Sequence, residues 1–224
     1  MISIVLDSST IISVSDSCLI RMLERLSNKT GIEFVITEGV EKESVITPSR
    51  IRRFELSALR VREAISAGWL RVMKRDASAI AMTNEMLNAA NSVFIANGRQ
   101  LQIIQEGEAE TVAIAKRISA GAMAIDERTT RMLFEDPYGL KAYLEYKYEE
   151  KISIDQKQLN YLTSAFGGTR IFRSTEFIAL AHELNLFGPD LGNEKRDLEA
   201  ALYALKFKGC AVSENEISDF VSGK

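Results

Sequence analysis

The sequence contains few of the residues that most enzyme sites use, with two cysteines, one histidine and three prolines in 224 residues. Cys18 and Cys210 are too few for a disulfide framework or a cysteine-rich zinc site. His182 is the only histidine, so catalysis by a Ser-His-Asp or Cys-His set is poorly supplied. No apolar run reaches the ~18 residues that span a bilayer, and no signal-peptide pattern opens the chain. We therefore expect a cytoplasmic protein without a membrane partner.

The chain also lacks a large excess of either charge, because 28 basic and 31 acidic residues give a net charge of −3 at pH 7. Hydrophobic residues make up 46% and charged residues 26% of the chain, which is typical of a globular protein. A slightly negative sum does not indicate nucleic-acid binding, but such binding depends on local patches rather than on the total. A site built from carboxylates would itself contribute to the negative charge.

What is present is a repeated pattern in which an apolar run ends at an aspartate. Residues 2–6 read as a strand buried on both faces and stop at Asp7. Residues 122–125 repeat the pattern and stop at Asp126. An aspartate at this place either caps the following helix or points into the ligand crevice that lies at the carboxyl ends of parallel strands.

Strands alternate with helices along the chain, and this alternation predicts a parallel sheet covered by helices. Further strands are expected at 33–37, 69–73 and 170–173, and long helices at 49–67 and 77–95. The predicted fold is a three-layer α/β/α sandwich with a central parallel sheet and a helical C-terminal extension. The main domain would span 1–187, with an insertion at about 137–168, and the extension would span 188–224, with a linker at 188–192.

Four acidic residues fall where they could share one crevice. Asp7 and Asp126 end two strands, and Glu43 and Glu110 lie near the starts of two helices. Convergent carboxylates without His or Cys are hard oxygen ligands that suit Mg²⁺ or Mn²⁺. They would repel one another without a cation, and a bound divalent metal supports phosphodiester hydrolysis.

The order of these motifs resembles a PIN domain, a family of metal-dependent ribonucleases that includes toxin nucleases and ribosomal-RNA processing factors. The matching segments are Val5-Leu6-Asp7-Ser8-Ser9, Thr37 through Val40 to Glu43, Gly107-Glu108-Ala109-Glu110 and Ile125-Asp126-Glu127-Arg128. The resemblance runs to about Phe134, resumes at 170–186, and omits the insertion and the C-terminal tail.

By this resemblance, Asp7, Glu43, Glu110 and Asp126 match the catalytic acidic residues that bind the metal. Glu108 and Glu127 match positions that assist in metal binding, and Ser9 matches a position that supports the first aspartate. The implied activity is endonucleolytic cleavage of RNA with Mg²⁺ or Mn²⁺. An inhibitory or assembly protein and a homodimer are further partners to be tested.

The RNA would need cationic residues outside an acidic crevice, because carboxylates repel phosphate. Arg50, Arg53 and Arg60 share one face of the helix expected at 49–67 and are the first candidates, with a solvated surface as the alternative. Tyrosines and lysines alternate in 138–161 and form a second candidate surface.

Two other functions stay open on the sequence. A non-catalytic PIN-type module would bind RNA or assemble with other proteins, although all four acids are present. An aspartate-dependent phosphotransferase also uses an aspartate after its first strand, but the haloacid-dehalogenase type has a second aspartate where this chain has Ser9.

Overall fold

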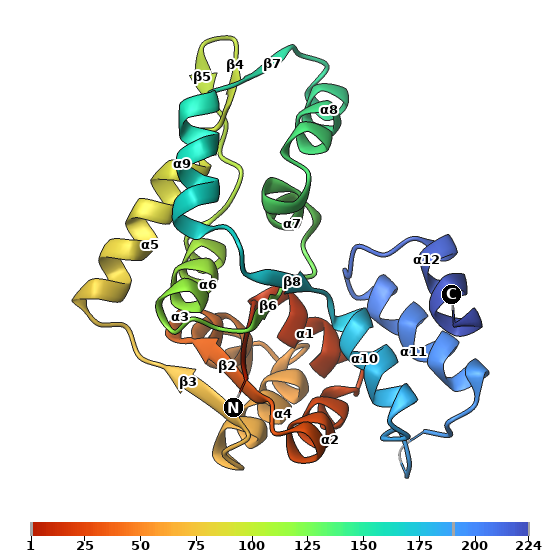
Figure 1. Ribbon diagram of the computed structural model, residues 1–224. Coiled ribbons are helices and arrows are strands. Elements are labelled where there is room, and N and C mark those ends of the chain that lie inside the picture. Colours follow the sequence, from red (N-terminus) through yellow and green to blue (C-terminus); the bar gives the residue numbers. More distant parts are fainter. Residues whose placement is uncertain (1, 190, 224) are drawn as a thin grey trace.

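A five-stranded parallel sheet lies at the centre of the computed structural model, which describes residues 2–189 and 191–223 (Figure 1). The strand order is β3-β2-β1-β6-β8. These strands are β1 (Ser3–Leu6), β2 (Glu33–Thr37), β3 (Leu70–Met73), β6 (Ala122–Ala124) and β8 (Arg170–Phe172). The sequence predicted each of them, and the predicted parallel α/β class is confirmed.

Both faces of the sheet are buried, as the unbroken apolar runs predict. In β1, Ile4 and Leu6 belong to one hydrophobic cluster, whereas Val5 belongs to another. Val5 is paired with Val35 on one side and with Met123 on the other. Successive side chains of a strand point to opposite faces, so the alternation of the two clusters marks the two sides of the sheet.

Helices cover both faces, an arrangement compatible with three layers. The first hydrophobic cluster takes residues from α1 (Ser8–Asp16), α2 (Ile20–Thr30), α4 (Glu55–Ser66), α10 (Ser174–Glu183), α11 (Lys195–Phe207) and α12 (Glu214–Ser222). The second takes residues from α5 (Ala77–Ala90), α6 (Glu106–Arg117), α7 (Arg128–Glu135), α8 (Pro137–Tyr148) and α9 (Gln156–Phe166). The C-terminal helices therefore share a core with the sheet.

The segment expected as an insertion contains α8, β7 (Ile152–Ile154) and α9. Strand β7 pairs antiparallel with β4 (Phe94–Ala96), which also pairs with β5 (Arg99–Gln100). These three strands form a second sheet, and Figure 1 shows it together with α5, α8 and α9 above the parallel sheet. The insertion thus packs on residues 77–100 and does not form an independent unit.

Two predicted helices have different bounds in the structure. Only Glu55–Ser66 of the segment 49–67 is an α-helix, because Pro48–Arg50 form a short 3₁₀ turn (η2) and Ile51 is extended. The residues between them are exposed, so no burial offsets the cost of another helical turn. The helix expected at 77–95 ends at Ala90, because residues 94–96 pair with β7.

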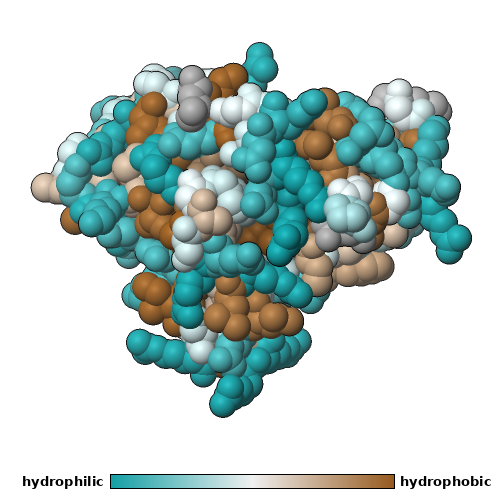
Figure 2. Space-filling model, turned by 90° about the horizontal axis from the view of Figure 1, so that it is seen from below, coloured by the Kyte–Doolittle hydropathy of each residue, from teal (hydrophilic) through white to brown (hydrophobic). Residues whose placement is uncertain are grey.

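In the part of the chain that the structure describes, no helix is both long and apolar enough to cross a membrane. On the face shown in Figure 2, hydrophilic residues predominate and hydrophobic residues form several separate patches. The linker expected at 188–192 includes Asp190, which lies outside the described residues.

Candidate functional site

Asp7 lies directly after β1, where the carboxyl ends of the parallel strands meet. It caps α1, because its Oδ2 accepts hydrogen bonds from the Ser9 backbone N–H (3.2 Å) and hydroxyl (2.7 Å). Its side chain is buried, and Thr111 Oγ1 lies 3.4 Å from its Oδ1. Burial raises the pKa of Asp7, the bonds from Ser9 oppose this shift, and the nearby charge of Glu43 adds to it.

A cavity of about 310 Å³ opens beside Asp7. Four carboxylates line it, those of Asp7, Glu43, Glu108 and Glu127. The other lining residues are Ser8, Ser9, Ile12, Ser13, Gln105, Gly107, Lys208 and Gly209. The four acids come from four motifs far apart in the sequence, and the fold brings them to one place at the end of β1.

Glu108 and Glu127 are held by the same threonine. Thr130 donates its hydroxyl to Glu108 Oε1 (2.7 Å) and its backbone N–H to Glu127 Oε2 (2.6 Å). Glu108 Oε2 also accepts from the backbone N–H of Gln105 (2.6 Å), which closes a capping box at the start of α6. Glu127 caps α7. Both carboxylates are therefore held in place at the N-terminal ends of helices, Glu108 at α6 and Glu127 at α7.

The environment of Glu108 favours its protonated form. Burial raises its pKa to about 7, and the charges of Asp7 and Glu127 push in the same direction against the bonds from Gln105 and Thr130. A carboxylate with such neighbours is less stable as an anion unless a cation lies among them. Burial is the main cause of the raised pKa, and the neighbouring carboxylates add a smaller rise.

Glu43 reaches the cavity from the turn that follows β2. The chain forms a short helix, α3 (Glu38–Glu41), and then a wider π-helical turn, η1 (Lys42–Ile46), that contains Glu43. Gly107 allows the carboxylate to approach α6, because a Cβ at Gly107 would lie 3.1 Å from Glu43 Oε1. A side chain at position 107 would therefore crowd Glu43.

Glu110 does not line the cavity, although it stands two residues after Glu108. Its Oε2 accepts hydrogen bonds from Thr37 Oγ1 (3.0 Å) and the Gly39 N–H (3.2 Å), and its Oε1 lies 3.1 Å from Arg75 Nε. Burial raises its pKa, opposed by Thr37 and Arg75. This buried carboxylate ties α6 to the segments after β2 and β3.

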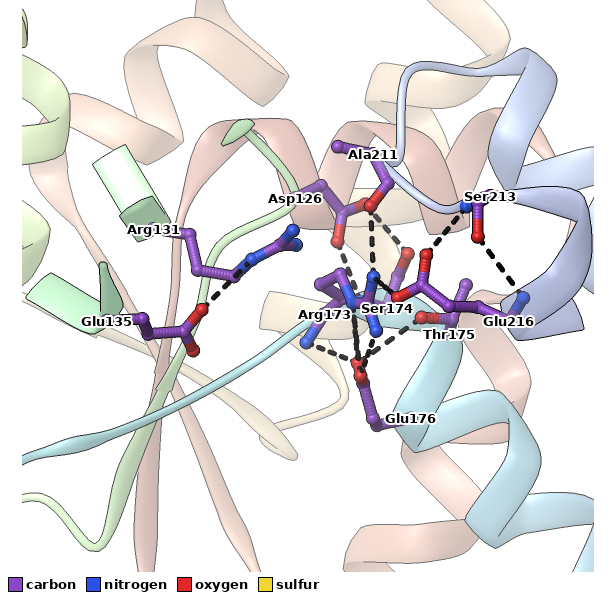
Figure 3. Close-up of polar contacts among 10 residues, drawn as sticks. All are labelled: Asp126, Arg131, Glu135, Arg173, Ser174, Thr175, Glu176, Ala211, Ser213 and Glu216. Carbon is purple, nitrogen blue, oxygen red and sulfur yellow. Dashed lines mark hydrogen bonds and ion pairs between the residues drawn. The ribbon is translucent and has the colours of Figure 1, made fainter. Parts of the chain in front are cut away.

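Asp126 also turns away from the cavity, towards the start of α10 (Figure 3). Its Oδ1 accepts from the Ser174 backbone N–H and its Oδ2 from the Ser174 hydroxyl, both at 2.7 Å. Thr10 Oγ1 lies 3.4 Å from Oδ1. The Asp126 N–H in turn donates to the Ser9 hydroxyl (3.2 Å). Ser9 therefore connects the two aspartates, but only Asp7 faces the cavity.

The three arginines expected to bind RNA do not share a helix face. Arg50 belongs to η2 and Arg53 to the following turn, and both are exposed. Arg53 lies over the Phe54 ring, with its guanidinium carbon 5.4 Å from the ring centroid. Arg60 is on α4 and donates to the carbonyl oxygen of Ser15 (3.1 Å). The expectation of a common face is wrong, because Ile51 is extended and interrupts the helix.

Sequence reasoning did not single out Lys208 or Thr130, and it considered Ser174 only as a possible cap of the helix that α10 forms, whose N-cap is Arg173. Thr130 has a local signal, since it follows the capping residue Glu127 by three positions. Ser174 has a helix-start signal, but its contact with Asp126 has none, and neither has the position of Lys208, because both residues meet the acidic motifs only through the fold. Within residues 2–189 and 191–223, no group of three or more Asp, Glu, His or Cys side chains is already arranged as a metal-ligand set.

No known protein-family model matches this chain, and no curated protein matches it.

Proposed function

We propose that this protein is a divalent-metal-dependent endoribonuclease with a PIN-type fold, and that its acidic cavity is the active site. The observation that carries the proposal is the meeting of Asp7, Glu43, Glu108 and Glu127 in one cavity. Each of the four motifs found in the sequence contributes one acid to this set. In the third and fourth motifs the acids that line the cavity are Glu108 and Glu127, which the resemblance gave as assisting residues, and not Glu110 and Asp126.

The donor set fits a hard cation. All four side chains offer carboxylate oxygens, and neither His nor Cys is among the described residues that line the cavity. Burial is the main cause of the raised pKa values of Asp7 and Glu108, and the charges of neighbouring carboxylates add a smaller rise that a cation would relieve. Asp7, Glu43, Glu108 and Glu127 would hold Mg²⁺ or Mn²⁺. Such a metal, when bound, lowers the pKa of a coordinated water and offsets charge on a phosphate.

The protein's own residues would prepare this site. Ser9 fixes the Asp7 carboxylate with two hydrogen bonds, and Thr130 fixes Glu108 and Glu127. These bonds orient the acids before RNA arrives, so little rearrangement would be needed on binding.

The test is cleavage of a fluorophore- and quencher-labelled single-stranded RNA with MgCl₂, with MnCl₂ and with EDTA. We expect cleavage with either metal and none with EDTA. Asp7→Asn should abolish cleavage and keep the fold, since asparagine also caps helices well. Glu63→Gln is the matched control, because Glu63 is an exposed acid 3.9 Å from Arg21.

Three outcomes decide between the candidate functions. Metal-dependent cleavage that is lost only in Asp7→Asn supports the nuclease. RNA binding without cleavage in any metal would favour the non-catalytic module. Cleavage that persists at the parent rate in Asp7→Asn would remove the cavity from the proposal.

A further inference from the structure

The C-terminal extension contributes one wall of the acidic cavity. Lys208 and Gly209, which follow α11, line it together with the four carboxylates. Among the described residues that line the cavity, Lys208 is the only cationic one. The segment lies outside the stretch that resembles the PIN family, so its presence here is a property of this fold.

Contacts on both sides fix the backbone that carries Lys208. The N–H of Ala211 donates to the carbonyl oxygen of Asp126 (3.2 Å), directly beside the strand that ends at the cavity. Arg173 donates to the carbonyl oxygen of Ala211 (3.0 Å) and forms an ion pair with Glu216 (2.7 Å), as Figure 3 shows. Leu205 and Cys210 are buried on either side of Lys208. The extension is therefore attached to the body at the cavity itself.

The ammonium group of Lys208 remains available to a ligand. Its Nζ lies 3.4 Å from Asp16 Oδ2, and the lysine side chain is 47% exposed. An ion pair of this exposure contributes little to stability, so its exchange for another anion costs little. A lysine is a compact charge with three rotatable donors, which suits a phosphate oxygen approached from several directions.

We infer that Lys208 binds a backbone phosphate of the nucleic-acid strand that occupies the acidic cavity. This inference rests on the proposed function. The four carboxylates repel phosphate, so a strand placed there needs a cation at the rim of the same cavity. Lys208 supplies this cation from the C-terminal extension. It does not come from residues 50–60, where the arginines were predicted to bind RNA. It is a positioning residue for the substrate and holds no metal.

The experiment uses full-length protein in the Asp7→Asn background, which keeps RNA intact. Binding of a fluorescein-labelled single-stranded RNA is measured by fluorescence anisotropy over a range of KCl concentrations. Lys208→Ala should weaken binding roughly fivefold, the size of one partly exposed ion pair, and reduce the salt slope by about 0.7. Lys206→Ala is the matched control, because Lys206 pairs with Glu214 (3.2 Å) and does not line the cavity.

A second pair of variants separates the charge from the packing. Asp16→Asn removes the carboxylate that competes for Lys208 and should leave RNA binding equal or tighter. Lys208→Arg should restore most of the affinity lost in Lys208→Ala, since the charge returns. Thermal unfolding of all variants should match that of the parent, because none of these side chains is buried.

Cleavage kinetics with the otherwise unmodified chain distinguish this inference from the proposed function. We expect Lys208→Ala to raise KM for RNA roughly fivefold with kcat unchanged. Equal affinity, KM and salt slope in Lys208→Ala and Lys206→Ala would overturn the role of Lys208 and leave the nuclease standing. Weaker binding in Lys208→Ala without metal-dependent cleavage in the parent would support Lys208 and overturn the nuclease. A parent chain that binds no RNA would overturn both.

Discussion

Ser174 donates two hydrogen bonds of 2.7 Å to Asp126, one from its backbone N–H and one from its hydroxyl. Both carboxylate oxygens of Asp126 thereby bind the start of α10, and Asp126 is not among the residues that line the cavity. The acid that follows β6 thus acts as a structural link, and its neighbour Glu127 faces the cavity. The division of roles between these adjacent acids leads to the first prediction.

Removal of the Asp126 carboxylate should lower stability. Asp126→Ala leaves the buried Ser174 N–H and hydroxyl without their acceptors, at a cost of about 2–3 kcal/mol in the free energy of unfolding. Urea unfolding followed by circular dichroism measures the loss. Asp219→Ala, at an exposed acid on α12, should stay within about 0.5 kcal/mol of the parent. A stable but inactive Asp126→Ala protein would instead place Asp126 in the active site.

Glu108 and Glu110 should behave differently when each is replaced by glutamine. Glu108→Gln removes a charge from the cavity and should lower the cleavage rate by more than roughly 100-fold, beyond the effect of outer metal partners. Glu110→Gln weakens the ion pair with Arg75 and should cost about 1–2 kcal/mol of stability. Cleavage rates and urea midpoints of both variants make the comparison. A larger loss of cleavage in Glu110→Gln than in Glu108→Gln would reverse the assignment.

Stability without metal should decrease as the pH rises through the range set by Glu108. Its folded-state pKa is about 7 against an ordinary 4.5, so the folded state holds more protons than the unfolded state between these values. The free energy of unfolding should therefore fall by at most about 3 kcal/mol between about pH 5 and 7.5, and level off above.

The pH effect has two controls. In Glu108→Gln the group no longer titrates, so the fall should be smaller than in the parent. With Mn²⁺ present, the cation favours ionised carboxylates, and the fall should shrink again. Thermal unfolding at matched ionic strength with EDTA or MnCl₂ provides the comparison. A parent and a Glu108→Gln curve of equal slope would show that Glu108 keeps an ordinary pKa.

Arg50 and Arg53 remain the predicted cations outside the cavity. The double variant Arg50→Ala/Arg53→Ala should weaken RNA binding and flatten its salt dependence by about 0.7 per lost phosphate contact. Arg21→Ala/Lys29→Ala removes the same charge from exposed positions of α2 and serves as the control. Equal effects of the two double variants would mean that only net charge matters. Arg60 is better left intact, because its bond to Ser15 supports α1 against α4.

The sequence alone was sufficient to predict the parallel sheet. Each of its five strands is a short stretch rich in aliphatic or aromatic residues that local composition marks without reference to the rest of the chain. It did not predict β4 or β7, because Phe94 and Ile154 become strand residues only by pairing with each other across 60 positions. It also extended a helix back over Arg53, where exposed residues gain nothing from a further turn.

The sequence likewise placed acids at the ends of β1 and β6 and at the start of α6, and so located the crevice. Which acid of each neighbouring pair faces it was decided by tertiary structure. Glu108 and Glu110 are two residues apart on a helix and point to nearly opposite sides, about 200° apart. Glu110 forms an ion pair with Arg75, and Asp126 accepts hydrogen bonds from Ser174. The C-terminal extension brings Lys208 to the cavity. These partners come from distant segments, and a buried carboxylate turns to whichever donors the fold places within its reach.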